Sequence, residues 1–222
     1  MSTLYLVRHG ENKANLTKEF SYRKIDYPLT VKGRLQAKQT AQVFQDKRID
    51  KIYTSPLLRA IETAETIARL TDNRVEVHES FRELDAGCLE DLPPSQENWQ
   101  TYFNVLKDWM DGRLESSFPG GENFYTASQR ARTAINEILP PNSSENVLVV
   151  GHGGIFFVAV TQICQGVNLK ALLDQENHNC SITSIESGWQ EGAYSGQLLR
   201  WADHAHLHGA AADLVSGLPD FP

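Results

Sequence analysis

The sequence predicts a three-layer α/β/α fold with a mostly parallel central sheet, built as one domain from residues 1–222. Two near-continuous apolar runs, at 3–7 and 146–150, are typical of strands buried on both faces, as in a parallel sheet. Helical and strand-like segments alternate along the chain, and this order builds a sheet covered by helices on both faces. A chain of 222 residues suits one core with a modest insertion.

Periodicity, capping residues and turn signals place the other elements. In chain order we expect a helix at 30–45, a strand at 51–55, a helix at 56–70, a strand at 74–81, helices at 124–138 and from 155, and late strands at 181–186 and 197–201. Thr30 is the expected N-cap of the first helix, with an inward face of Leu35, Ala37, Ala41 and Phe44. Ser55 is the expected N-cap of the second, with Pro56 at its first position.

Residues 84–123 interrupt the alternation and are interpreted as a small helical insertion beside the core. They contain Pro93-Pro94, an aromatic helical pattern and the turn Pro119-Gly120-Gly121. An insertion over a catalytic face is where a lid would lie, so Tyr102 or Trp109 is a candidate for the lining of a substrate pocket, with packing as the alternative. The Ala/Gly-rich tail 209–222 is expected to be mobile.

Composition and charge exclude several classes of function. The net charge of −7 disfavours nucleic acid and anionic membranes as partners. No apolar run reaches the length of about 18 residues that a membrane span needs. Three widely spaced cysteines indicate reduced thiols in a cytoplasmic protein. His204, His206 and His208 lie near the C-terminal tail, and no carboxylate cluster accompanies them apart from Asp203, so no metal site is expected there. No cofactor is expected either. The oligomeric state cannot be inferred.

Two histidines stand where a ligand would bind. In open α/β sheets, ligands lie beyond the carboxyl ends of the strands. His9 and His152 each follow a predicted buried strand, and each precedes a glycine whose backbone can approach an anion. Arg8 offers a guanidinium fork for phosphate, and Arg59 lies in the first turn of its expected helix. Such a cluster of positive groups predicts a phosphate site.

Phosphoryl transfer needs a nucleophile, charge stabilisation and a proton donor. A neutral imidazole suits the first role because histidine titrates near neutral pH. Arginines can neutralise the phosphoryl oxygens without Mg²⁺. Glu83, which follows the strand predicted at 74–81, is the best-placed proton donor, and Asp85 is the next candidate. The charge of a bound phosphate would favour the protonated form of the donor.

Six ordered motifs resemble the signature of the histidine phosphatase superfamily, the phosphoglycerate-mutase-like proteins. They span roughly residues 3 to 186 and read Leu6-Val7-Arg8-His9-Gly10-Glu11 with Asn15, Pro28-Leu29-Thr30-Val31-Lys32-Gly33, Thr54-Ser55-Pro56-Leu57-Leu58-Arg59-Ala60, Arg82-Glu83-Leu84-Asp85-Ala86-Gly87, Pro119-Gly120-Gly121-Glu122 and Gly151-His152-Gly153-Gly154. The sequence departs from the common pattern at Asn12, where Thr is usual, and at Glu90-Asp91, where Glu-Gly is frequent. Neither position has a catalytic role.

The resemblance implies a phosphoglycerate-mutase-like fold and a set of roles. His9 would be the phosphorylated nucleophile and Glu83 the proton donor. The phosphoryl group would be held by Arg8, Arg59 and His152, with added contacts from Asn15 and the Gly153 N–H. Glu122 is expected to cap a helix rather than bind substrate. The implied activity is that of a metal-independent phosphoric monoester hydrolase acting on a small phosphorylated substrate.

Two alternatives remain at this stage. One is a phosphoglycerate-type mutase, and the other is a catalytically silent module that binds a phosphorylated ligand. The complete set of predicted catalytic residues argues against the silent module. The stretch 84–118 is short and aromatic-rich, with Lys107 and Arg113 as its basic residues, which favours a phosphatase for a substrate with an uncharged or partly apolar body. Arg23 and Lys24 could supply the missing charge if they folded over the site.

Overall fold

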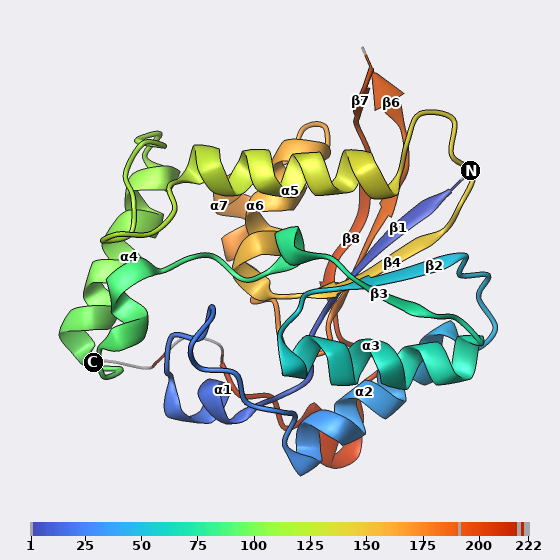
Figure 1. The fold of residues 1–222 in the computed structure, drawn as a ribbon, viewed down its shortest axis with the longest axis horizontal. Coiled ribbons are helices and arrows are strands. Elements are labelled where there is room, and N and C mark those ends of the chain that lie inside the picture. Colours follow the sequence, from blue (N-terminus) through green and yellow to red (C-terminus); the bar gives the residue numbers. More distant parts are fainter. Residues whose placement is uncertain (1, 191, 217–218, 220–222) are drawn as a thin grey trace.

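The computed structural model of the chain describes residues 2–190, 192–216 and 219. A six-stranded sheet of order β3-β2-β4-β1-β5-β8 forms its middle layer (Figure 1). The strands are β1 (Thr3–Arg8), β2 (Lys51–Thr54), β3 (Val75–Val77), β4 (Val147–Gly151), β5 (Ile182–Glu186) and β8 (Gln197–Asp203), and a small hairpin adds β6 (Trp189–Gln190) and β7 (Ala193–Tyr194). The helices are α1 (Lys13–Thr17), α2 (Val31–Phe44), α3 (Leu58–Thr71), α4 (Gln96–Met110), α5 (Phe124–Ile138), α6 (Gly153–Ile163) and α7 (Leu169–Leu173), with short 3₁₀ turns at Glu79–Phe81, Gly87–Asp91 and Gly209–Ala212.

The sheet is mostly parallel, which confirms the predicted class. β1 pairs in parallel with β4, and β2 pairs in parallel with both β4 and β3. β5 pairs antiparallel with both β1 and β8, so it runs against the other strands of this sheet. The parallel strands therefore bring their carboxyl ends to one edge, where ligands bind in folds of this type.

Helices cover both faces of the sheet, with α2 and α3 on one face and α5 and α6 on the other (Figure 1). The fully buried strand β4 shows why. Val147 and Val149 belong to the core shared with α5 and α6, whereas Leu148 and Val150 belong to the core shared with α2 and α3. Burial of each of these side chains contributes roughly 1.5–3 kcal/mol. A strand whose side chains pack into a core on each face of the sheet is apolar at every position.

Strand register brings the two histidine motifs together. Arg8 is the register partner of Gly151, so His9 and His152 follow neighbouring strands at the same level. Thr54 pairs with Val150 one strand further along, which places Ser55 beside them. The site is thus assembled by sheet pairing between segments that are distant in sequence.

The predicted start of α3 was wrong. The helix begins at Leu58 rather than at Pro56, and its N-cap residue Leu57 makes no side-chain cap. The Ser55 hydroxyl is instead engaged with the His152 ring and the Leu57 N–H. The carboxylate of Asp26, from the loop before α2, accepts a hydrogen bond from the Leu58 N–H at 2.9 Å. The N-terminus of α3 is therefore capped by a residue from a distant part of the chain, which a local sequence pattern cannot predict.

Other boundaries also differ from the predictions. Leu35 was expected to face inward, but it is 37% exposed, whereas Ala37, Ala41 and Phe44 are fully buried. The strand predicted at 74–81 is limited to β3, and a 3₁₀ turn takes its second half. The helix expected from Ile155 begins at Gly153, directly after His152.

The insertion predicted at 84–123 contributes α4, which lies at one side of the core (Figure 1). The tail predicted to be mobile, 209–222, falls partly outside the described residues. Within its described part, Ala211 is fully buried and its carbonyl accepts a hydrogen bond from Gln36 of α2. No described helix is long and apolar enough to cross a membrane.

Candidate active site

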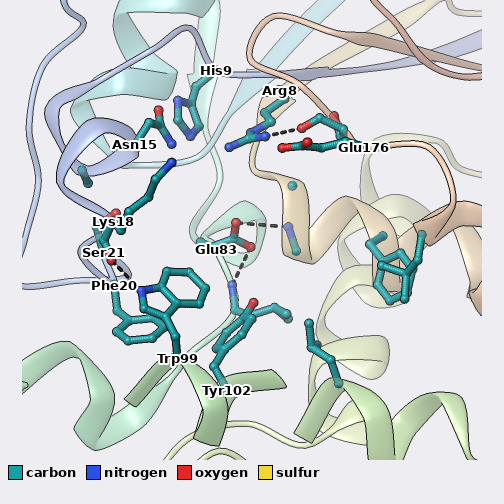
Figure 2. Close-up of a pocket in the computed structure, with 18 of the residues that line it drawn as sticks. Arg8, His9, Asn15, Lys18, Phe20, Ser21, Glu83, Trp99, Tyr102 and Glu176 are labelled. Atoms are coloured by element: carbon teal, nitrogen blue, oxygen red, sulfur yellow. Dashed lines mark hydrogen bonds between the residues drawn. The ribbon is translucent and has the colours of Figure 1, made fainter. Parts of the chain in front are cut away.

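A cavity of 340 Å³ opens at the carboxyl ends of β1 and β4. It contains most of the predicted site, and Figure 2 shows His9, Asn15, Arg8 and Glu83 at one end of it. The predicted residues in its lining are Arg8, His9, Asn15, Arg59, Glu83 and Gly153. His152 does not line the cavity but lies directly behind, with its ring centroid 5.1 Å from that of His9.

The geometry of His9 defines its tautomer. Its Nδ1 lies 2.7 Å from the Gly10 carbonyl oxygen, which can only accept, so Nδ1 carries the proton. Nε2 therefore holds a lone pair, which accepts a hydrogen bond from Arg59 Nε at 3.2 Å. Burial, followed by the positive charges of Arg59 and Arg8, holds the pKa of His9 well below its usual range. The imidazole is thus neutral at neutral pH.

Two buried arginines flank this imidazole. Arg59 is 2% exposed, and its Nη2 donates to the Ser21 carbonyl at 2.7 Å. Arg8 is 8% exposed and donates through Nη1 to the Asn177 carbonyl. Burial lowers the pKa of both guanidinium groups, that of Arg59 to about 10, so both stay charged at neutral pH. Asp26 also lies 3.9 Å from Arg59 Nη1. Two buried cations beside His9 make this end of the cavity suited to an anion.

His152 is fully buried and held by Ser55, whose Oγ lies 2.7 Å from His152 Nε2. Burial, Arg59 and His9 hold the pKa of His152 well below its usual range. Its Nδ1 has no hydrogen-bond partner among the described residues, and the same is true of Arg8 Nε and Arg59 Nη1. Buried donors without partners are costly. Nitrogens of this kind on three basic side chains indicate a site for an anion.

Glu83 is fixed by backbone N–H groups from two segments. Its Oε1 accepts from Leu84 and Ile155 at 2.8 Å each, and its Oε2 accepts from Gly154 at 3.1 Å (Figure 2). A Cβ at Gly154 would lie 2.7 Å from Glu83 Oε1, so a side chain there would require the carboxylate to shift. The N-terminus of α6 therefore determines where the carboxylate lies.

Asn15 is oriented by two donors. Its Oδ1 accepts from the Asn12 N–H at 3.1 Å and from Asn179 Nδ2 at 3.2 Å. The amide NH₂ group is therefore left toward the cavity, on the side of His9 in Figure 2. Gly153 lies against Arg8, since a Cβ there would meet the guanidinium at 3.6 to 3.7 Å.

Three residues that position the site are absent from the sequence predictions. Asn179 is buried and its Nδ2 also donates to the His9 carbonyl at 3.0 Å. Asn177 provides the carbonyl for Arg8. Arg130 of α5 donates to the carbonyls of Ser80, Arg82 and Glu83 and pairs with Glu122 at 2.7 Å. The two asparagines at 177 and 179 could have been noticed in the sequence. The backbone carbonyl of Asn177 leaves no pattern in the sequence, and Arg130 cannot be distinguished there from other arginines in helices.

Glu122 does not cap α5, because Asn123 is the N-cap and Glu122 instead accepts from the Asp85 N–H at 3.0 Å. The expectation of a helix cap at Glu122 was therefore wrong. Asp85, the second candidate for the proton donor, accepts from the Gly87 N–H and is not part of the cavity lining. Of the two candidates for the proton donor, Glu83 is the one that lines the cavity.

Of the two aromatic candidates, Tyr102 lines the cavity. Trp109 is 1% exposed and packs between Phe118 and Phe124, which matches the packing alternative.

Arg23 and Lys24 do not turn toward the phosphate site. Lys24 pairs with Asp91, and the Arg23 guanidinium lies over the Tyr22 ring. The backbone N–H groups of both residues donate to the buried Glu90 carboxylate at 2.7 and 2.8 Å. Glu90 therefore fixes the backbone at Arg23 and Lys24, and neither residue lines the cavity.

The described residues contain no group of three or more His, Cys, Asp or Glu side chains placed to hold a metal ion. The side chains of the C-terminal histidines diverge. His204 stacks edge-on against His178, whereas His206 Nε2 lies 2.9 Å from the Thr40 hydroxyl.

Comparisons with known proteins show which sequences and folds this chain resembles. Residues 4–204 match the family model of the histidine phosphatase superfamily, branch 1. A probable phosphoglycerate mutase GpmB of Salmonella choleraesuis is 32% identical over 219 residues, covering 96% of this chain and 98% of the relative. A putative phosphoserine phosphatase 2 of Hydrogenobacter thermophilus is 30% identical over 188 residues, covering 83% and 89%. The structure of a phosphoserine phosphatase from Entamoeba histolytica in complex with 3-phosphoglyceric acid superposes with a TM-score of 0.76 at 24% identity, covering 94% and 100%.

Proposed function

The chain belongs to the histidine phosphatase superfamily, and from that premise we propose that it is a phosphomonoesterase that hydrolyses a small phosphorylated metabolite without a metal ion. The nucleophile is His9 and the proton donor is Glu83. The observation that carries the proposal is the state of His9, a neutral imidazole with Nδ1 fixed on the Gly10 carbonyl and Nε2 facing two buried arginines.

In the first step the lone pair of His9 Nε2 attacks phosphorus, and the bond from phosphorus to the ester oxygen breaks. A phosphoryl oxygen takes over the hydrogen bond that Arg59 Nε donates to Nε2 in the free protein. Arg8, Arg59, Asn15 and the Gly153 N–H stabilise the transferring group, and His152 Nδ1 supports it from behind. The Glu83 carboxyl donates its proton to the leaving alkoxide.

In the second step water attacks the phosphohistidine. Glu83, now a carboxylate, accepts the proton of that water, and the bond from nitrogen to phosphorus breaks. Inorganic phosphate is released and neutral His9 is regenerated.

The location of the protein is a separate proposal. The three cysteines are free thiols, which supports the proposal that the protein acts in the cytoplasm.

The test is to trap the intermediate with a radiolabelled aryl phosphate. We expect a phosphoenzyme that is stable in alkali and labile in acid, as a phosphohistidine is, and that is absent in His9→Ala. His78→Ala is the matched control, since His78 is half-buried, pairs with Glu137 and lies outside the cavity. A His9→Ala variant that kept a tenth of the turnover would contradict the assignment of the nucleophile.

A phosphoglycerate-type mutase is the second candidate, because several relatives at 32% identity are named probable phosphoglycerate mutases. A mutase must hold a second anionic group of its substrate, and Arg23 and Lys24 are turned away from the cavity. With 3-phosphoglycerate and a catalytic amount of the bisphosphate, we expect free phosphate to form faster than the isomer. Isomer formation that far exceeds phosphate release would favour the mutase.

A further inference from the structure

The cavity has two chemically different ends. One end holds the groups assigned to phosphoryl transfer, and the rest is lined by two sets of apolar side chains, here called the two walls. Figure 2 shows Phe20, Trp99 and Tyr102 of the first wall. A volume of 340 Å³ is at the lower end of the range of about 300–1,000 Å³ that small-molecule sites occupy. The part of the substrate beyond the phosphate must therefore be small and must suit these walls.

The first wall is aromatic and rigid. Phe20 and Trp99 lie with ring centroids 4.4 Å apart, and Trp99 and Tyr102 lie 5.3 Å apart (Figure 2). The Trp99 indole donates to the Lys18 carbonyl at 2.9 Å, and Tyr102 stacks on Phe118 at 4.7 Å. Burial, reinforced by Glu83, raises the pKa of Tyr102, so its phenol is neutral. These contacts hold the three rings of Phe20, Trp99 and Tyr102 in place as an aromatic wall whose rings are tilted against one another.

The second wall comes from the other half of the chain and includes Phe157 of α6, Leu172 and Leu173 of α7, and Trp201 of β8. Trp201 fixes the segment after α7, because its indole donates to the Leu172 carbonyl at 3.0 Å and to the Gln175 carbonyl at 3.2 Å. A ligand body between the two walls would be enclosed by apolar side chains on both sides.

The charges in the lining disfavour a second anion. Among the described residues that line the cavity, the cations are Arg8, Arg59 and Lys18, and the first two are assigned to the phosphoryl group. Lys18 Nζ donates to the Ser216 carbonyl at 2.5 Å. The carboxylates of Glu19 and Glu176 also line the cavity. Glu19 accepts a hydrogen bond from the Tyr27 hydroxyl, and Glu176 lies 3.9 Å from His178 Nδ1. A substrate carboxylate or second phosphate near either residue would meet a like charge.

Resting on the proposed phosphatase function, we propose that the substrate is a phosphate monoester of an alcohol that carries a ring or other compact apolar body and no second anionic group. The walls around Trp99 and Leu172 bind the apolar body, and the carboxylates Glu19 and Glu176 reject phosphoglycerates and phosphoserine. Specificity then differs from what the names of the relatives would suggest.

The test compares monoesters with similar leaving groups, namely 2-phenylethyl phosphate, glycerol 3-phosphate, 3-phosphoglycerate and O-phosphoserine. We expect kcat/KM for 2-phenylethyl phosphate to exceed that for each of the two carboxylates by about ten-fold or more, mainly through KM. The reverse order would overturn the inference and leave the phosphatase function standing. No phosphate release from any ester, 4-nitrophenyl phosphate included, would overturn both.

A positive charge introduced among the apolar residues of the cavity should change the preference for 2-phenylethyl phosphate over the carboxylate substrates. Leu106 of α4 lines the cavity, and Leu106→Arg should reduce the preference for 2-phenylethyl phosphate over 3-phosphoglycerate by about ten-fold or more. Met110→Arg is the matched control, since Met110 lies one turn further along α4, is 41% exposed and is outside the lining. Leu173→Arg provides a second variant should Leu106→Arg fail to fold, because Leu173 is 39% exposed. An unchanged preference in the folded variant, or an equal change in the Met110 control, would overturn the inference.

Discussion

Gly154→Ala tests whether the position of the Glu83 carboxylate matters for leaving-group protonation. The added Cβ would lie 2.7 Å from Glu83 Oε1 and 2.8 Å from Leu84 Cδ1. An ordinary contact between carbon and oxygen is about 3.3 Å or longer, so the carboxylate must move by roughly 0.6 Å. That movement strains the hydrogen bonds from the Gly154 and Ile155 N–H groups to Glu83, which are 3.1 and 2.8 Å long.

The expected cost follows from the geometry. A positioned general acid contributes about 10²–10⁴-fold, and a misplacement of about 1 Å can cost 10²-fold. A shift of roughly half that size should lower kcat for an alkyl phosphate by about ten-fold or more. An aryl phosphate leaves without a proton, so its turnover should change only a few-fold. Overpacking costs about 1–3 kcal/mol of folding free energy, offset by up to about 1 kcal/mol because alanine favours the helix.

The assay measures kcat for an alkyl phosphate and for 4-nitrophenyl phosphate in the variant, in Glu83→Gln and in the double variant. Because both substitutions act on one carboxyl group, the double variant should be no slower on the alkyl ester than Glu83→Gln alone. Thermal melting reports the packing cost separately. Equal losses on both substrates, or additive losses in the double variant, would refute the argument that Gly154 acts through Glu83.

Three further predictions concern the rest of the site. Activity should survive EDTA, because the phosphoryl charge is neutralised by arginines, and loss in EDTA with recovery on adding a divalent metal would contradict this. Ser55→Ala should lower kcat by about ten-fold with little change in KM, because the His152 ring loses its hydrogen bond at 2.7 Å, and an unchanged kcat would show that Ser55 does not orient it. The pKa of both His9 and His152 is held below the usual value, so the unfolded chain binds protons below about pH 6.5 that the folded protein does not. The free energy of unfolding in urea should therefore fall as pH drops below about 6.5, by up to about 2.7 kcal/mol per pH unit for the two groups, and a variant lacking both imidazoles should show a smaller slope.

The fold class and the proximity of most candidate site residues could be predicted from the sequence because they rest on local patterns. A strand buried on both faces is apolar at every position, as in β4, and its end is marked by the change to Gly151-His152. β1 follows the pattern less strictly, since Thr3 and Tyr5 are only partly buried, and its end is marked by Arg8-His9. Parallel pairing then requires that the two ends meet, so the proximity of His9 and His152 follows from the class of fold.

The start of α3 shows where local patterns fail. Ser55-Pro56 is a good N-terminal signal, but Ser55 binds His152 and the helix is capped by Asp26, 32 residues away from Leu58. The preference of serine for the N-cap position did not decide the start of α3, because the Ser55 hydroxyl forms a hydrogen bond with the His152 ring instead.

By itself the sequence determined which residue types stand at the ends of the buried strands, and so which chemistry is possible. The tertiary structure decided the rest, including the tautomer of His9, the backbone cradle of Glu83, the exclusion of Arg23 and the apolar walls of the cavity. These features depend on hydrogen bonds to backbone groups and on contacts between distant segments, such as Arg8 with Asn177. Every residue has a carbonyl and an N–H, so such partners leave no pattern in the sequence and exist only once the chain has folded.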